Sequence, residues 1–204
     1  MITALEALER LKVGNQRFIS DESSLGTQVT HERRNEVVAG QAPIAIILGC
    51  SDSRVPAEII FDQGLGDLFV IRVAGNIVAP SQVGSIEFAV ERFGTPLVVV
   101  LGHSSCGAVE ATLEGLKNPM GNRSSNLNSI VDRIAPSVET LLETELRDQP
   151  DALLHFSIRA NIRASVNQLK RGSHVLERSV NSGKLMVVGA SYSLKTGNVE
   201  FLDL

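Results

Sequence analysis

Apolar residues in this chain form four short continuous runs, and the stretches between them carry apolar positions every three or four residues. Gly, Pro or Asp residues lie beside these runs, which cover residues 44–48, 68–73, 97–101 and 185–190. Unbroken apolar runs of this length are typical of strands buried on both faces of a parallel sheet. The pattern therefore predicts a central sheet with four parallel strands.

Segments with helical spacing surround these predicted strands. Thr3 and Glu6 have the spacing of a capping box, so we expect a helix over residues 3–19, followed by a loop over residues 20–30. Helices between consecutive strands suit the crossover connections of a parallel sheet. Such helices are predicted at residues 83–93 and 108–116.

The last third of the chain is predicted to form helices followed by a hairpin. Residues 127–146 have a strong helical period, and a second helix is expected to open at Pro150-Asp151 and to stop at Gly172. Ser173 is suited to cap a short helix to about residue 180. The turn residues 196–198 should then fold 199–202 back beside the strand at 185–190.

These elements indicate a three-layer α/β/α fold. Its central sheet is mostly parallel, with four strands plus a C-terminal antiparallel strand, and an N-terminal helical arm precedes it. We expect a single domain over residues 1–204, divided into a helical arm at 1–40 and an α/β core at 41–204. A chain of 204 residues with 43% hydrophobic content is long enough for one good core.

Charge and cysteine content limit the kinds of partner and the cellular location expected for this chain. The net charge of -4 gives no electrostatic footprint for nucleic acid. The first residues lack the pattern of a signal peptide, and no apolar stretch approaches the roughly 18 residues that span a bilayer. Two cysteines without an export signal are expected to stay reduced, so the expected location is cytoplasmic. Without secretion, the formal glycosylation sequon at Asn122 has no role.

Both cysteines stand in polar clusters that directly follow predicted strands. Cys50 follows the first strand, while His103 and Cys106 follow the third. Parallel sheets hold ligands at the carboxyl ends of their strands, so these side chains should converge. Two thiolates and one imidazole are the number of protein ligands in catalytic zinc sites, which keep a fourth position for water or substrate. A helix start at Cys106 would favour its thiolate.

Asp52 and Arg54 lie two residues apart, so on an extended segment they face the same way and can pair. A carboxylate held by arginine stays ionised, and it can accept the hydrogen of a zinc-bound hydroxide or ligate zinc itself. The alternative is that Cys50 and Cys106 are small buried apolar residues and His103 is a satisfied turn residue. A purified protein without stoichiometric metal would support that alternative.

Six segments carry a resemblance to a known family. They are GNQRF at 14–18, GQAP at 40–43, CSDSRVP at 50–56, FVIRVAGN at 69–76, SIEF at 85–88 and GHSSCGA at 102–108. In these motifs the chain resembles a beta-class carbonic anhydrase over most of its first 110 residues. The remaining part is similar in its helical pattern and final hairpin more than in motif.

The resemblance implies one Zn²⁺ per chain, held by Cys50, His103 and Cys106, with Asp52 and Arg54 as the active-site dyad. It implies reversible hydration of carbon dioxide to bicarbonate and a proton, by attack of zinc-bound hydroxide on CO2 in an apolar pocket. In some members the aspartate closes the site as fourth ligand. The subgroup with a separate inhibitory bicarbonate site uses a tryptophan, which this chain lacks, so we expect the open arrangement at neutral pH.

The resemblance also implies a substrate pocket shared between subunits. Gln41 and the Gly107 backbone amide would hydrogen-bond substrate or bicarbonate, and Phe69, Ala74 and Phe88 would line the apolar part. Phe88 stands where a tyrosine is frequent, which removes a hydroxyl but keeps the pocket. In the family Gln41 and the aromatic residues act across a dimer interface, so we expect a homodimer or a dimer of dimers (a homotetramer), with no nucleic-acid or membrane partner.

Two rival functions remain open. The first is a zinc hydrolase that acts on carbonyl sulfide or carbon disulfide, because these molecules are also small linear substrates suited to an apolar pocket. The second is a non-enzymatic module in which Asp52 completes a closed structural site. The histidines His31, His155 and His174 fall in segments expected at the surface, where a proton-shuttle role is less expected than a solvated one.

Overall fold

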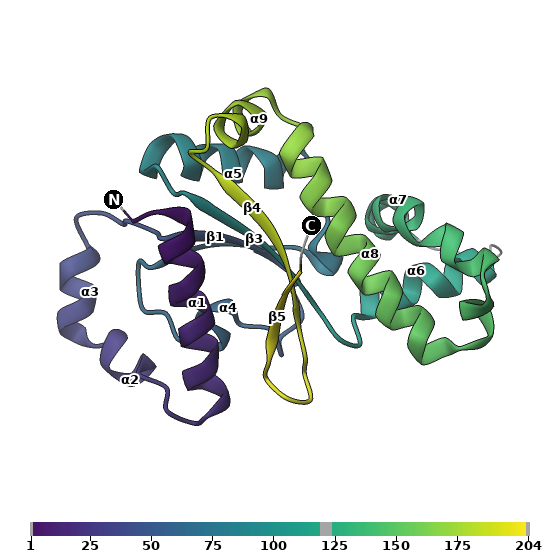
Figure 1. Cartoon of the computed structure of the whole chain (residues 1–204), viewed down its shortest axis with the longest axis horizontal. Helices are drawn as coiled ribbons and strands as arrows, with labels where there is room; N and C mark the ends of the chain where they lie inside the picture. The colour runs from purple at the N-terminus through teal and green to yellow at the C-terminus, as the bar shows by residue number, and fades with distance from the viewer. Residues whose placement is uncertain (1, 119–123, 203–204) are drawn as a thin grey trace.

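A five-stranded sheet forms the centre of the computed structural model, which describes residues 2–118 and 124–202 (Figure 1). The strand order is β2-β1-β3-β4-β5; the first four strands run parallel and β5 is antiparallel to β4. The strands are β1 (Ala45–Gly49), β2 (Leu68–Arg72), β3 (Leu97–His103), β4 (Met186–Tyr192) and β5 (Val199–Leu202). The predicted sheet and its closing antiparallel strand are confirmed.

Helices cover both faces of the sheet, which gives three layers (Figure 1). Successive side chains of β1 point to opposite faces: Ile46 and Leu48 pack in one apolar cluster, Ala45 and Ile47 in the other. The second cluster includes α1 (Ala4–Ile19) and α4 (Ala57–Ile60). The first includes α5 (Pro80–Phe93), α6 (Gly107–Lys117), α7 (Ser125–Val138), α8 (Pro150–Arg171) and α9 (His174–Asn181).

Most of the predicted helices are confirmed within a few residues. Thr3 and Glu6 form the complete capping box of α1. Gly172 follows the last residue of α8, and the Ser173 side chain accepts from the Leu176 amide at the start of α9. Among the described residues, no helix is both long enough and apolar enough to pass through a membrane. Asn122 lies outside the described residues.

The loop predicted at residues 20–30 is wrong in part, because it contains the short helix α2 (Leu25–Gln28), and α3 (His31–Val37) follows it. The buried carboxylate of Asp62 accepts hydrogen bonds from both Ser23 and Ser24, directly before α2. This anchor comes from a distant part of the chain. Apolar spacing within the segment therefore could not reveal it.

The single long helix predicted over residues 127–146 is also wrong. The α-helix ends at Val138 and continues as two 3₁₀ segments, η2 (Glu139–Glu143) and η3 (Glu145–Asp148). Pro136 lies inside α7, where it has no amide hydrogen for the preceding turn. Thr144 separates the two segments, and its hydroxyl accepts from the Leu146 amide. The apolar spacing continues past Pro136 and through both 3₁₀ segments, so it could not show where the α-helix ends.

Asn15 and Gly14 fasten α1 to the rest of the chain. The Asn15 amide group donates to the carbonyls of Ile60 (3.1 Å) and Gly197 (2.8 Å), and its oxygen accepts from the Val199 amide (2.8 Å). This contact needs close approach, because a Cβ on Gly14 would lie 1.9 Å from the Phe61 carbonyl oxygen. A glycine at position 14 is therefore what lets α1 reach the segment after α4.

We expect Gly14→Ala to lower the free energy of unfolding by about 3 kcal/mol, because the added methyl group meets fixed backbone. Gly84→Ala is the matched control: Gly84 is also helical, but nothing lies within 4 Å of the position that a Cβ would take there. That variant should be neutral or stabilised by up to about 1 kcal/mol. Denaturant unfolding measures both, and equal stability of the two variants would contradict the close approach.

Candidate metal centre

Three buried side chains meet at the carboxyl edge of the sheet. Cys50 directly follows β1, His103 is the last residue of β3, and Cys106 is the N-cap of α6. Their exposed fractions are 5%, 0% and 1%. One potential ligand atom from each, two sulfurs and an imidazole nitrogen, lies within 4.8 Å of the others. The convergence predicted from strand ends is confirmed.

The imidazole of His103 is oriented for a ligand. Its Nδ1 lies 3.0 Å from the Ser104 carbonyl oxygen. A carbonyl oxygen only accepts, so Nδ1 carries the hydrogen and Nε2 presents a lone pair. Nε2 is buried and has no hydrogen-bond partner among the described residues. A buried nitrogen acceptor left in this state is what a bound metal ion would satisfy.

Strand β4 holds the turn that follows His103. The Ser104 amide donates to the Tyr192 carbonyl (2.9 Å), and the Ser104 hydroxyl accepts from the Leu194 amide (3.0 Å). Ser105, the next residue, has a φ of 54°, which non-glycine residues adopt infrequently. These contacts turn the chain so that Cys106 returns to the same side as His103.

The two thiols influence each other. A hydrogen bond from Cys106 lowers the pKa of Cys50, and the Gly75 amide, which donates to the Cys50 sulfur at 3.3 Å, acts in the same direction. Its hydrogen bond to Cys50 and burial raise the pKa of Cys106. The pair therefore favours one thiolate, and a cation at the centre would favour the second. Both cysteines are unpaired, as expected for reduced residues.

Asp52 and Arg54 form the expected pair beside this centre. The guanidinium donates from Nε to Oδ1 (2.9 Å) and from a terminal nitrogen to Oδ2 (2.6 Å). The Arg54 side chain thereby holds the pKa of Asp52 far below its ordinary value. Asp52 Oδ2 lies 4.0 Å from His103 Nε2. An ionised carboxylate thus lies beside the three candidate ligands.

Arg72 at the end of β2 supports the backbone between Cys50 and Asp52. Its guanidinium donates to the Cys50 carbonyl (3.1 Å) and to the Asp52 carbonyl (2.6 Å). We did not predict a role for Arg72 from the sequence, nor for Gly75, which lies three residues later. Both lie inside the FVIRVAGN motif, so a polar residue at a strand end and a glycine shortly after it were the signals available.

Ala74 precedes Gly75, whose amide binds Cys50, and Gly107 directly follows Cys106, so both adjoin the centre in the chain. The other predicted pocket residues do not adjoin it. Gln41 lines a surface cavity with Gly66 and Asp67 before β1, and that five-residue strand, about 16 Å long, separates it from Cys50. The aromatic rings of Phe69 and Phe88 pack with Phe93, with centroids 5.7 to 6.3 Å apart. Phe69 lies opposite Ile46, four residues before Cys50, so within one chain Phe69 is displaced along the strands from the metal centre.

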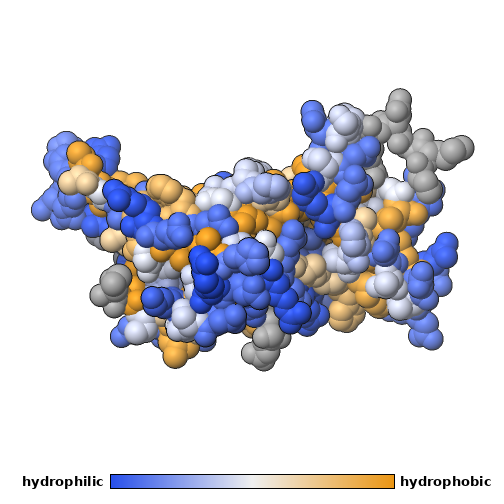
Figure 2. All heavy atoms as spheres, turned by 90° about the horizontal axis from the view of Figure 1, so that it is seen from above, coloured by the Kyte–Doolittle hydropathy of each residue, from blue (hydrophilic) through white to orange (hydrophobic). Residues whose placement is uncertain are grey.

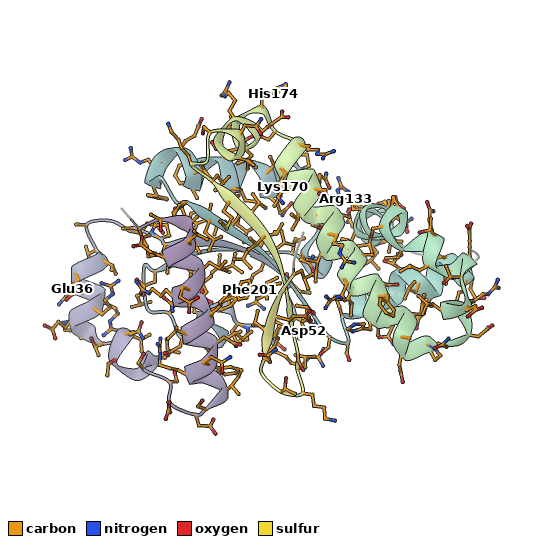
Figure 3. All side chains as sticks on the ribbon, in the orientation of Figure 1. Glu36, Asp52, Arg133, Lys170, His174 and Phe201 are labelled. Carbon is orange, nitrogen blue, oxygen red and sulfur yellow. The ribbon has the colours of Figure 1, made fainter. Side chains whose placement is uncertain are left out.

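The aromatic cluster reaches the surface of the chain at Phe88. Phe88 on α5 has 53% of its surface exposed although it contacts two other rings. Figure 2 looks from above and shows a hollow between two raised ends, along which apolar and polar side chains are mixed. The histidines lie elsewhere: His31, His155 and His174 are exposed, and Figure 3 shows His174 far from Asp52.

Residues 45–199 match the carbonic anhydrase family model. Carbonic anhydrase 2 of Mycobacterium tuberculosis is 41% identical over 200 residues, covering 97% of this chain and 92% of that protein. The solved β-carbonic anhydrase CcaA superposes with a TM-score of 0.76 at 25% identity, covering 96% and 95% of the chains. A tetrameric β-carbonic anhydrase of Sordaria macrospora gives a TM-score of 0.75 at 26% identity, covering 84% and 86%. The chain belongs to the β-carbonic anhydrases, enzymes whose general reaction is the hydration of carbon dioxide.

Proposed function

We propose that this chain catalyses the zinc-dependent, reversible hydration of carbon dioxide to bicarbonate and a proton. One observation carries the proposal: a buried imidazole nitrogen and two thiols lie together beside an arginine-held carboxylate. This nitrogen, Nε2 of His103, has no hydrogen-bond partner within the described part of the chain. Two sulfurs and one imidazole suit zinc better than harder cations such as magnesium or calcium. Three protein ligands also leave a position for the reacting molecule.

In this proposal Cys50, His103 and Cys106 hold one zinc ion. When bound, zinc supplies a Lewis acid that brings the pKa of a coordinated water towards roughly 7 and so provides a nucleophile for the carbon of CO2. The sulfurs of Cys50 and Cys106 would neutralise the ion's formal charge. A more weakly polarising centre of this kind makes the help of a neighbouring carboxylate more important.

Asp52 is suited to orient the nucleophile by accepting its hydrogen. Its lowered pKa keeps it deprotonated, and therefore an acceptor, throughout the neutral range. Both of its oxygens bind Arg54, so Asp52 would have to give up this pairing to become a fourth ligand. These contacts support an open site, in which Arg54 holds the carboxylate back from the ion.

The substrate pocket of this proposal requires a second copy of the chain. Gln41 and the aromatic rings lie away from Cys50 in their own chain, and β2, which carries Phe69, is an edge strand beside exposed Phe88. A partner that brings these residues to the Ala74 and Gly107 side of the metal centre would complete an apolar pocket. We propose a homodimer or a dimer of dimers, with Gln41 and the Gly107 amide as hydrogen-bond donors to bicarbonate.

The two rivals differ in what they require of the site. A hydrolase of carbonyl sulfide or carbon disulfide would use the same residues, so a comparison of substrates must separate it. A closed structural site would require Asp52 as fourth ligand, and its bidentate pairing with Arg54 argues against that. The cytoplasmic location and the single domain over residues 1–204 remain proposals of the same kind.

Zinc-loaded protein should accelerate carbon dioxide hydration in a stopped-flow assay, and chelation of the metal should abolish the activity until zinc is restored. The same preparation given carbonyl sulfide measures hydrogen sulfide release, and faster release than hydration would favour the rival hydrolase. No hydration between about pH 7 and 9 would favour the structural site. In the open state activity should change gradually with pH, whereas a steep collapse below about pH 8 would indicate closure by Asp52.

Asp52→Asn should lower turnover roughly 10- to 100-fold while zinc content stays near one ion per chain. The change replaces the charged carboxylate by a neutral amide, which is a weaker acceptor, and removes none of the three proposed ligands. Glu200→Gln is the matched control, since Glu200 also forms a bidentate pair with an arginine, Arg159. Among the described residues, no hydrogen bond or ion pair joins Glu200 to Asp52 or to the three candidate ligands. The control should keep full turnover. Stopped-flow rates measure turnover, and metal analysis measures zinc content. An Asp52→Asn enzyme as fast as wild type would exclude a role for Asp52 in orienting the nucleophile.

Mixing two impaired variants tests the shared pocket. In a heterodimer of Asp52→Asn and Gln41→Ala chains, one site carries both changes and the other carries neither. Random exchange of subunits should therefore restore up to about a quarter of wild-type activity in a two-fold dimer. Each variant incubated alone is the control. No recovery after verified exchange would show that Gln41 does not serve the partner's site.

A further inference from the structure

The short segment η1 (Ala74–Asn76), which follows β2, has a backbone that needs outside support. Gly75 and Asn76 have φ values of 69° and 44°, so two successive residues lie in the left-handed region. Asparagine tolerates this region, but glycine is the residue that adopts it freely. A Cβ on Gly75 would lie 2.7 Å from Ile134 Cδ1. Asn76 therefore holds a backbone conformation that non-glycine residues rarely adopt, and Gly75 has no room for a side chain.

Helix α8 supplies that support through two buried polar side chains. Asn161 and Ser165, one helical turn apart, have exposed fractions of 2% and 4%. The Asn161 amide donates to the Gly75 carbonyl (2.8 Å), and the Ser165 hydroxyl donates to the Asn76 carbonyl (3.3 Å). The neighbouring buried positions Ile162 and Val166 are apolar. Burial of a polar group is unfavourable without a hydrogen bond, so these two contacts explain polar residues on this face.

A hydrogen bond joins the supported turn to the metal centre. The Gly75 amide donates to the Cys50 sulfur over 3.3 Å. Asn161 holds the carbonyl of the same residue, which belongs to the peptide unit after the one that carries this amide. It thereby restrains the φ and ψ rotations of Gly75, on which the direction of the amide depends. We propose that Asn161 is a positioning residue, which acts through Gly75 to hold and polarise the Cys50 sulfur as a metal ligand. This inference rests on the proposed function in one respect, the binding of a metal ion by Cys50.

The amide hydrogen bond has two physical effects on a thiolate ligand. It draws electron density from the sulfur, which leaves the metal a stronger Lewis acid, and it restrains the side chain in the ligating orientation. Groups that orient metal ligands in this way typically change metal affinity by about 10- to 100-fold when they are removed. Loss of Asn161 should therefore alter the metal centre although Asn161 touches no ligand atom.

Asn161→Leu tests the inference, because leucine has a similar shape but cannot donate to Gly75. In the cobalt-substituted protein, the sulfur-to-cobalt charge-transfer band should move to longer wavelength, and zinc affinity measured against a chromophoric chelator should fall about 10-fold. Ser157→Ala is the matched control, since Ser157 is buried on the same helix and its hydroxyl has no partner among the described residues. It should leave the band and the affinity unchanged.

A folded Asn161→Leu protein with the wild-type band and zinc affinity would overturn the inference. Failure of the wild-type chain to bind cobalt or zinc would instead overturn the proposed function. A measurement on the wild-type protein covers the case of an unfolded variant: after substitution with cadmium-113, the Gly75 amide proton should show a scalar coupling to the metal through the sulfur. Its absence in a cadmium-loaded protein would contradict the contact on which Asn161 is proposed to act.

Discussion

The pairing of β1 with β3 is the constraint on which the metal centre depends. Gly49 lies opposite Leu101, so both strands reach the same edge of the sheet almost together. Cys50 then follows at once, while β3 continues as far as His103. A slip of one residue would turn every side chain of β1 to the opposite face and move the thiol away from the imidazole. The apolar residues that fix this register are therefore as necessary to the site as the ligands.

Side chains that are not candidate ligands hold the segments that follow β1, β2 and β3 at this edge of the sheet. Arg72 binds the backbone after β1, Ser104 ties the turn after β3 to β4, and Asn161 reaches η1 from α8. None of these three side chains contributes a candidate ligand atom. Together they convert flexible loops into a fixed arrangement, and such preorganisation is what metal sites require of a protein scaffold.

The sequence predicted those parts in which local pattern and structure agree. Unbroken apolar runs predicted the sheet, and motif position predicted the convergence of Cys50, His103 and Cys106. It did not predict α2, because Asp62 anchors that segment from a distance, or the end of α7 near Pro136. The role of Asn161 was not predicted either, because its partner Gly75 is also distant in the sequence. A polar residue in an apolar helix face acquires its meaning only from the carbonyl that it meets in three dimensions.

The hydrogen bonds of Asn15 also limit the order in which parts of the fold can form. Its oxygen accepts from Val199, a residue 184 positions later in the sequence. During synthesis α1 emerges first, but this contact forms only after the last strand has been made. Contacts between such distant residues carry a large loop-closure entropy and are slow to form. The attachment of α1 to the last strand can therefore form only when almost the whole described chain is present, although α1 can pack on β1, β3 and α4 before that.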